Sequence, residues 1–393
     1  MNVLLLAPHP FYQERGTPIA IDLLLRVLSE RGDSVDIVTY HEGRPVDYPN
    51  VRIFRIPDLP WIRNVRPGFS IKKLVCDFFM MFKIMALLSK KRYEVVHSVE
   101  EAVFMAVLLR WFGGIPYIYD MDSSLPDQMV GAIPPLKRIR RGLDYFEGLA
   151  VRNSELIVPV CESLARVAEK RGAKRIVIVP DVALLGDGAP SRTSRLKQDL
   201  GIGGVLLMYV GNLEPYQGVD LLLESFAIAS RVKEDANLVI IGGAAGHIKQ
   251  YTEKCERLNL GGRVHFLGPK PLADLGGYLS EADILVSPRI KGANTPMKVY
   301  SYLQSGKAVL ATDLVTHTQV LNREVAFLSA PDPVEFSRAM VELIEKPDMR
   351  RRLGEEGKRL IEKEFNFESF RSRVRRAYDM VESDLRGNGR GPQ

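Results

Sequence analysis

The hydrophobic residues of the first half of the chain form short continuous runs separated by longer amphipathic stretches. An apolar run at 3–7 is followed by 18–32, where apolar residues recur at helical spacing between Pro18 and Gly32, and then by a second run at 35–40. Strand, helix and strand in this order are typical of a βαβ unit in a parallel sheet covered by helices. Four more strands are predicted at 94–98, 115–120, 156–160 and 176–180.

The same alternation restarts after 181–204, a segment rich in Gly, Asp, Ser and charge. Strands are predicted at 205–211, 238–243, 263–268, 283–288 and 308–312, with helices at 219–233, 247–258, 271–280 and 296–305, and 333–385 is nearly all helical in pattern. Because 393 residues exceed what one core usually serves, two domains are expected. We predict an N-terminal domain over 1–183, a second over 184–370, and a segment 371–393 whose helix packs back on the first domain before a frayed tail.

Composition adds limits on environment and partners. The net charge of +6 and pI near 9.1 favour anionic partners without naming one. The three cysteines are far apart, which supports neither a disulfide framework nor a zinc site, and the start lacks the basic region of a signal peptide; both features favour the cytoplasm. No apolar run is long enough to span a membrane, and the nearest, 74–92, is broken by Asp77 and Lys83. It is either a buried domain helix or one that also lies on a membrane surface.

The richest candidate chemistry follows the strand at 283–288. Thr295 is expected to cap a helix that begins at Pro296, which would leave the N–H groups of 297 and 298 unpaired at the positive end of the helix dipole. Such an end attracts anions, and a diphosphate would fit beside the nearby cations Arg289, Lys291 and Lys298. The alternative is an ordinary capped helix with solvated cations.

Two other glycine-bearing turns accompany this segment, at 14–20 and at 211–218. Gly16 would allow the backbone to approach a ligand closely. Neither turn matches GxGxxG or a P-loop, so the dinucleotide and ATP fingerprints are absent.

From 205 to 330 the chain contains YVGNLEPYQGVDLLLESF, LVIIGG, VHFLGPKPLADLGGYLSEADILVSP and TPMKVYSYLQSGKAVLATD in this order. This ordered set resembles glycosyltransferase family 4, the retaining enzymes of the GT-B architecture, and the resemblance extends from the first strand to about residue 385. It implies an α/β fold with two Rossmann-like, doubly wound domains facing a central cleft. It also implies that the N-terminal domain binds the acceptor and the C-terminal domain binds the nucleotide sugar.

The resemblance implies residue roles as well. Gly16 would shape a loop beside the donor diphosphate, Gly268, Pro269 and Lys270 would hold the nucleotide base, and Ser301 would face the ribose. The stretch Asn294, Thr295, Pro296, Met297 and Lys298 would grip the diphosphate and the sugar. The remaining expected donor contacts are Gly211, Asn212, Gln217, Gly243, Arg289 and Lys291, and the expected catalytic residues are His97, Asp122 and Lys298.

Single-residue alternatives stay open beside these roles. His97 ends a predicted strand and is equally consistent with a buried histidine whose nitrogens are satisfied by the protein. Asp122 could simply cap the next segment.

The sequence departs from the family pattern at several of these positions. Ala293 and Ser301 stand where two glutamates are usual, and Asn212 and Gln217 stand where an Arg and a Lys usually neutralise the phosphates. Asp122 replaces a common histidine, and Asp181 and Val182 replace the usual asparagine and glycine. The chain is therefore either a divergent subgroup with a rearranged donor site or a non-catalytic member.

The resemblance predicts transfer of a hexose-type sugar from a UDP- or GDP-sugar to a glycan or lipid-linked acceptor, with retention of configuration. No cofactor besides this co-substrate is expected, and no metal, since no DxD-like pair ends a strand in the donor half. Basic clusters at 72–73 and 137–141 beside apolar stretches are consistent with a peripheral contact with an anionic membrane or with solvated helix faces. Nucleic acid is not expected, because aromatic residues are not interleaved with the basic clusters. The alternative function is a catalytically silent sugar-nucleotide-binding or scaffold subunit.

Overall fold

The computed structural model describes residues 1–14, 16–65, 68, 70–183, 185 and 194–387. The chain divides into two compact units, and we describe each by itself. Unit 1 comprises Met1–Pro180 and Glu368–Gln393, and unit 2 comprises Asp181–Phe367. The boundaries expected from the sequence, after residues 183 and 370, each fall three residues beyond these. Much of the connection expected at 181–204, and the end of the expected tail, lie outside the described residues.

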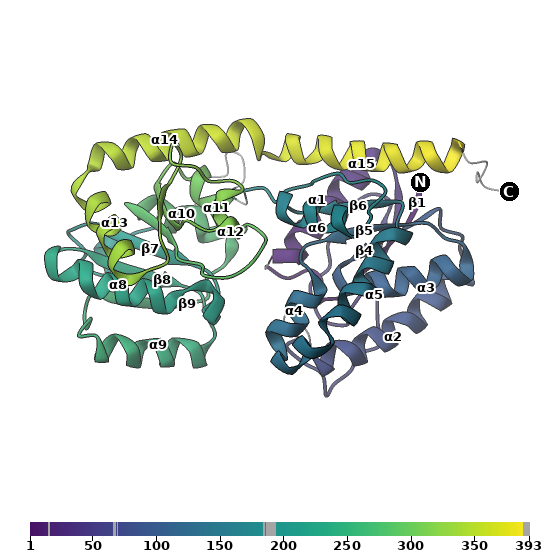
Figure 1. Cartoon of the computed structure of the whole chain (residues 1–393), viewed down its shortest axis with the longest axis horizontal. Helices are drawn as coiled ribbons and strands as arrows, with labels where there is room; N and C mark the ends of the chain where they lie inside the picture. Colours follow the sequence, from purple (N-terminus) through teal and green to yellow (C-terminus); the bar gives the residue numbers. More distant parts are fainter. Residues whose placement is uncertain (15, 66–67, 69, 184, 186–193, 388–393) are drawn as a thin grey trace. The chain divides into compact units, whose positions relative to one another are not determined.

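Unit 1 is built on a six-stranded parallel sheet in the order β3-β2-β1-β4-β5-β6. Its central strands are continuous buried runs because helices cover both faces. The strands are β1 (Asn2–Ala7), β2 (Ser34–Thr39), β3 (Val51–Arg55), β4 (Val95–Val99), β5 (Tyr117–Met121) and β6 (Leu156–Pro159). The helices are α1 (Gly16–Arg31), α2 (Ile71–Leu88), η1 (Glu100–Ala102), α3 (Val103–Gly113), α4 (Leu125–Ala132), η2 (Pro134–Ile139), α5 (Arg140–Asn153), α6 (Glu162–Lys170) and α15 (Phe367–Gly387) (Figure 1).

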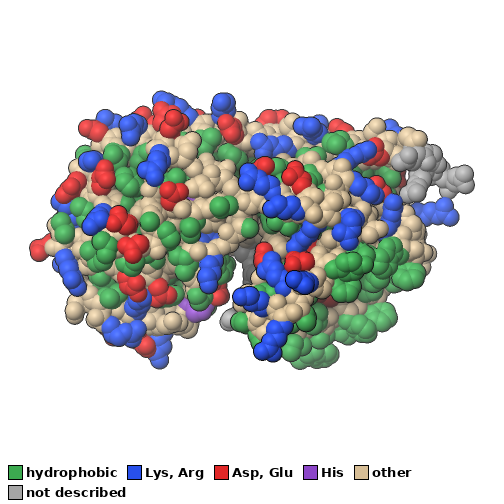
Figure 2. Space-filling view, in the orientation of Figure 1, with side chains coloured by type: hydrophobic (Ala, Val, Ile, Leu, Met, Phe, Trp, Pro, Cys, Tyr) green, Lys and Arg blue, Asp and Glu red, His purple; other side chains and the backbone are tan. Residues whose placement is uncertain are grey.

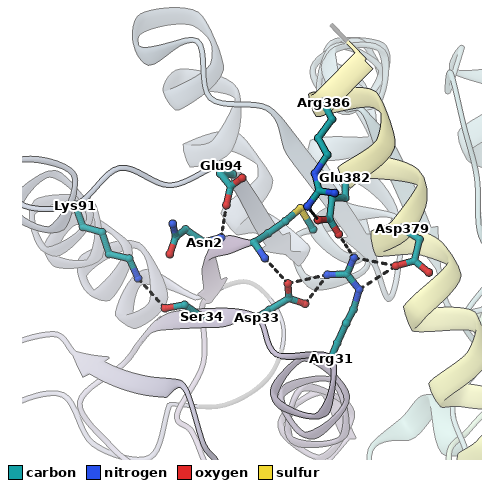
Figure 3. Close-up of polar contacts among 10 residues, drawn as sticks. Asn2, Arg31, Asp33, Ser34, Lys91, Glu94, Asp379, Glu382 and Arg386 are labelled. Atoms are coloured by element: carbon teal, nitrogen blue, oxygen red, sulfur yellow. Dashed lines mark hydrogen bonds and ion pairs between the residues drawn. The ribbon is translucent and has the colours of Figure 1, made fainter. Parts of the chain in front are cut away.

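The last helix, α15, is held to the beginning of the chain by a polar network (Figure 3). Arg31, at the end of α1, donates two hydrogen bonds to the Asp33 carboxylate at 2.7 and 2.8 Å, and Asp33 also pairs with the N-terminal ammonium at 2.6 Å. The same guanidinium donates to Asp379 of α15 at 2.8 and 3.0 Å and pairs with Glu382. Residues almost 350 positions apart in the sequence are thereby joined in one ion-pair network.

Unit 2 contains a second six-stranded parallel sheet, in the order β12-β11-β10-β7-β8-β9. The strands are β7 (Leu206–Val210), β8 (Asn237–Ile241), β9 (Val264–Gly268), β10 (Ile284–Ser287), β11 (Ala308–Thr312) and β12 (Phe327–Ser329). Its helices are α7 (Leu196–Asp199), η3 (Pro215–Gln217), α8 (Val219–Val232), α9 (Ala245–Arg257), η4 (Leu272–Asp274), α10 (Leu275–Glu281), α11 (Lys298–Gln304), α12 (Val315–Thr318), α13 (Pro333–Glu345) and α14 (Pro347–Glu364). Apolar clusters on the two faces of this sheet form its core.

The predicted α/β class with two doubly wound sheets is confirmed, but three strand assignments differ. The strand expected at 176–180 is reduced to a single bridge between Ile157 and Ile176. Two strands had no clear signal: β3, at a sheet edge, has two arginines among its five residues, and β12 has only three residues. Among the described helices none is both long and apolar enough to cross a bilayer.

Candidate functional site

The strand order of unit 2 places two of the predicted loops next to each other. From β7 the chain winds outward to β8 and β9, and then returns to add β10 on the other side of β7. The loops after β7 and β10 therefore leave the same edge of the sheet in opposite directions, and the space between them is where open α/β sheets bind ligands. The segment from Gly211 to Gln217 follows β7, and the segment from Arg289 to Lys298 follows β10.

The loop after β10 is shaped by the side chain of Arg289. This buried guanidinium donates to the carbonyl oxygen of Lys291 at 2.7 Å and to the carbonyl and side-chain oxygens of Asn294 at 3.3 and 3.0 Å. It also lies over the ring of Tyr216, 5.3 Å from the centroid. Arg289 thus organises the loop around a fixed positive charge.

The helix after this loop begins later than the sequence predicts. α11 starts at Lys298, and Pro296 and Met297 form a preceding turn, with the Val299 N–H donating to the Pro296 carbonyl at 2.9 Å. The expectation that Thr295 caps a helix opening at Pro296 is therefore wrong. The Thr295 side chain is 3% exposed, and its hydroxyl has no hydrogen-bond partner within the described ranges. A buried hydroxyl in that state costs about 1–3 kcal/mol.

Lys298 is the central cation of the site. Its ammonium lies 3.9 Å from the centroid of the Tyr209 ring and donates to Gln217 Oε1 at 3.2 Å. Burial lowers the pKa of Lys298 well below its usual value, and the positive charge of Arg289 lowers it further. No carboxylate in the described part of the chain forms an ion pair with this ammonium. An anion bound beside it would supply the missing negative charge.

Two glycines allow close approaches at this site, one to the Lys298 ammonium and one between the segments after β7 and β10. A Cβ at Gly211, which has φ 150°, would lie 2.7 Å from the Lys298 ammonium nitrogen. A Cβ at Gly218, with φ 74°, would lie 1.9 Å from the carbonyl oxygen of Pro288. Only glycine fits the second position, because both the backbone angle and the space exclude a side chain.

A buried histidine that was not predicted from the sequence, His317, lies among the residues that hold this loop. His317 Nδ1 donates to the carbonyl oxygen of Thr312 at 3.0 Å, so Nε2 accepts from the Ser287 hydroxyl at 2.8 Å. Burial lowers the pKa of His317 to about 3, with a further contribution from Arg289 and Lys298. The histidine is therefore neutral at physiological pH.

The residues around His317 carry its effect to the loop. Thr312 donates to the Arg289 carbonyl at 2.6 Å, and Thr316 donates to the Asn294 carbonyl at 2.7 Å. Gln319 donates to the Ala293 carbonyl at 2.7 Å. These residues lie some twenty positions beyond the loop in sequence, and a run of Thr and His after a strand end is the only local signal for them.

The other expected donor contacts lie along the same sheet edge or inside the unit. Asn212 follows Gly211, and its carbonyl oxygen accepts from the Tyr209 hydroxyl at 2.6 Å. Gly243 follows β8, Gly268 ends β9, and Pro269 and Lys270 are exposed in the next turn. Lys291 is exposed, whereas Ser301 is buried in α11 with 1% exposure. The roles assigned to these residues stay predictions.

Unit 1 contains the remaining candidates. His97 is 2% exposed, with Nε2 3.2 Å from the Asp120 carboxylate and Nδ1 2.9 Å from the Tyr378 hydroxyl of α15. Both ring nitrogens are thus occupied by the protein's own groups. Asp122 follows β5, and Gly16 is the first residue of α1. The catalytic roles assigned to His97 and Asp122 stay predictions.

The strand order of unit 1 creates a second edge of the same kind, between β1 and β4. Glu100 and Glu101 follow β4, and Glu101 pairs with the buried Lys73 of α2. Glu100 has φ 46°, and burial together with the charge of Glu101 raises its pKa to about 7. The sequence did not single out these carboxylates, because the contact between Glu101 and Lys73 depends on long-range packing. Within the described residues no cluster of three or more His, Cys, Asp or Glu side chains has the geometry of a metal site.

Two family models match the chain, one in each half. Residues 15–181 match the model described as Glycosyltransferase Family 4, and residues 193–360 match Glycosyl transferases group 1. The chain belongs to glycosyltransferase family 4. Both halves of this family 4 glycosyltransferase therefore match glycosyltransferase models, one up to residue 181 and one from residue 193.

Relatives of this family 4 glycosyltransferase are distant but extensive. An uncharacterized glycosyltransferase of Methanocaldococcus jannaschii is 23% identical over 350 residues, covering 87% of this chain and 89% of the relative. The D-inositol 3-phosphate glycosyltransferase of Corynebacterium diphtheriae is 24% identical over 362 residues, covering 86% and 84%.

Solved structures agree on the fold. Sucrose-phosphate synthase from Thermosynechococcus elongatus matches with a TM-score of 0.80 at 18% identity, covering 98% of this chain and 99% of that one. The Anabaena protein HepE, solved in complex with UDP-glucose, matches with a TM-score of 0.74 at 15% identity, covering 97% and 100%. At these identities the likeness concerns the GT-B fold of the family 4 glycosyltransferase.

Proposed function

We propose that this glycosyltransferase transfers a hexose-type sugar from a UDP- or GDP-sugar to a glycan or lipid-linked acceptor, with retention of anomeric configuration. The observation that carries the proposal is the buried amine of Lys298 at the topological switch point of unit 2, which has no carboxylate partner among the residues that the structure describes. Family membership supports the nucleotide sugar as the anion, and so does the structural neighbour HepE, which was solved with UDP-glucose.

The proposed donor site uses the groups described above. The diphosphate accepts from the Lys298 ammonium and from N–H groups of the turn before α11, with the positive charge of Arg289 nearby. The Thr295 hydroxyl is a further donor that a phosphate oxygen could satisfy. Gly211 leaves the space in which the phosphate approaches the ammonium.

In the proposed reaction, the bond between the anomeric carbon and the β-phosphate oxygen breaks while the acceptor hydroxyl oxygen bonds to that carbon on the same face. The hydroxyl proton passes to the departing phosphate oxygen. The protein contributes by holding the reactants in position and by stabilising negative charge on the leaving group with Lys298.

The test is nucleotide release from a panel of UDP- and GDP-sugars by the purified full chain, with glycan and lipid-linked acceptors. Release that depends on acceptor, together with a product whose anomeric configuration matches the donor by NMR, is the expected result. Release with inverted configuration would contradict retention. Absence of release from every donor in the panel would contradict the transfer activity itself.

A second candidate function is a catalytically silent sugar-nucleotide-binding subunit. It is favoured by Asn212 and Gln217, neutral residues where the family usually has two phosphate-neutralising cations. Calorimetry together with the release assay separates the candidates: both bind UDP or GDP, but a silent subunit leaves the nucleotide sugar intact.

A further inference from the structure

α2 is hydrophobic on the side that faces away from its unit. Its inner side is buried through Cys76, Met80 and Ile84. Its outer side carries five exposed apolar residues, each three or four positions after the one before, so they form one stripe along the helix. They are Ile71, Leu74, Phe78, Phe82 and Met85, between 51% and 77% exposed. A helix that packs on its unit with one side and faces water with the other normally has a polar outer side.

α3 continues this surface. The connections through α2, from β3 to β4, and through α3, from β4 to β5, run in the same direction across the sheet, so right-handed crossovers place both helices on one face. Figure 1 shows them together at the lower right, and Figure 2 shows hydrophobic side chains gathered in that region. We call the outer stripe of α2 and four exposed residues of α3, Phe104, Leu108, Trp111 and Phe112, the apolar patch.

Positive charges predominate beside the apolar patch. Segment 71–92 contains six Lys or Arg residues and a single acidic residue, Asp77. Two of the six are already paired, because the buried Lys73 contacts Glu101 and Lys91 contacts Asp36. Asp77 is turned toward the protein, where it accepts from the Tyr40 hydroxyl at 2.6 Å. On the same face, 137–141 runs from the end of η2 into α5 and holds four cations and no acid. Arg140 pairs with Asp127 and Asp144, and Lys137, Arg138 and Arg141 are exposed.

We propose that the apolar patch is a membrane-docking face, with α2 and α3 lying flat on a bilayer that contains anionic lipids. Exposed Phe and Trp side chains enter the boundary between headgroups and acyl chains, where aromatic residues are favoured. The neighbouring cations lie among the anionic headgroups. The contact is peripheral, and it stands independently of the donor-site proposal because it involves only unit 1.

Charge decides between a bilayer and a second copy of the chain. A two-fold dimer through this face would pair the same surface with itself, so the basic segments 71–92 and 137–141 would be brought toward their own counterparts. Like charges brought together repel, whereas an anionic leaflet supplies the opposite charge. The basic surroundings of the patch therefore favour lipid.

The test is co-sedimentation of the full chain with vesicles of phosphatidylcholine, with and without phosphatidylglycerol. Wild type is expected to bind the anionic vesicles, and more weakly at high salt. Replacing Phe78 and Phe82 together by Ser should weaken partitioning by at least about tenfold, because two aromatic side chains no longer leave water. Replacing Lys137 and Arg138 together by Glu should weaken binding by at least about fivefold per cation on anionic vesicles only.

The matched control is the double change of Ile228 and Val232 to Ser, at exposed positions of α8 in unit 2, which should leave partitioning unchanged. Unchanged thermal unfolding of all variants verifies that they are folded. Wild type that ignores anionic vesicles, or a Phe78 and Phe82 variant that binds as well as wild type, would overturn the proposal. So would a dimer in sedimentation velocity that this variant dissociates, since the patch would then be a self-association surface.

Discussion

Replacing Lys298 by Met separates the binding role of this residue from any structural role. Met is similar in length, keeps an apolar stem, and can contact the Tyr209 ring that now lies 3.9 Å from the ammonium. The change removes one hydrogen bond to Gln217, worth about 1 kcal/mol, but also removes a charge that burial disfavours. We therefore expect the free energy of unfolding to change by less than about 1 kcal/mol.

Nucleotide binding should respond much more strongly. A hydrogen bond from an ammonium to a phosphate contributes about 1.5–3 kcal/mol, so the Kd for UDP or GDP should rise about 10- to 150-fold. Isothermal titration calorimetry with whichever nucleotide wild type binds measures this change, and urea unfolding measures stability. Lys363→Met, at an exposed position of α14, is the matched control and should bind as wild type does. A folded Lys298→Met variant with wild-type affinity would refute the placement of the diphosphate beside this residue.

Three further predictions concern protonation and backbone fit. The pKa of Lys298 is lowered in the free protein and would be raised by a bound diphosphate, so nucleotide binding should take up a proton. Binding should therefore weaken as pH rises between the two pKa values of Lys298. Calorimetry in buffers of different ionisation enthalpy measures the proton uptake, which Lys298→Arg should abolish. Gly218→Ala should destabilise the protein by at least about 1–3 kcal/mol, because φ of Gly218 is positive and the new Cβ would meet a carbonyl oxygen. Gly246→Ala in α9, where the Cβ would enter open space, should be neutral or stabilise the protein by up to about 1 kcal/mol. Equal effects of the two changes on urea unfolding would contradict this account. Because the pKa of His317 is lowered to about 3, the unfolded chain binds more protons than the native protein between about pH 6.5 and 3. The free energy of unfolding should therefore fall with decreasing pH in this range, by up to about 1.4 kcal/mol per pH unit. Urea unfolding of His317→Gln across this range should lack the contribution of His317 to this pH dependence.

The two doubly wound sheets could be predicted because their strands are buried on both faces and appear as continuous apolar runs. Strands without that property were harder to assign. The edge strand β3 has Arg52 and Arg55 among its five residues, and its pairing with β2 comes from neighbouring strands rather than from its own pattern. At 176–180 the apolar run is present, yet it makes only one bridge to β6.

The candidate site could be located from the sequence, but the contacts between its residues could not be predicted. Family order points to the loop before α11, and the structure brings Gln217, Lys298 and Gly211 together there. The helix start was misplaced because Thr-Pro matches a capping pattern that the local turn overrides. The support from His317 depends on contacts between segments about twenty to thirty residues apart, which no local pattern encodes.

The chain enters unit 2 after Pro180 and returns to unit 1 at Glu368, so α15 completes a unit whose sheet was begun by the first residues. During synthesis from the N-terminus, the carboxylates on α15 that pair with Arg31, and the Tyr378 partner of His97, emerge only after the whole of unit 2. Unit 2, encoded by one uninterrupted segment, can therefore reach its final form first. Unit 1, in contrast, lacks α15 and the contacts that this helix makes until unit 2 has been synthesised.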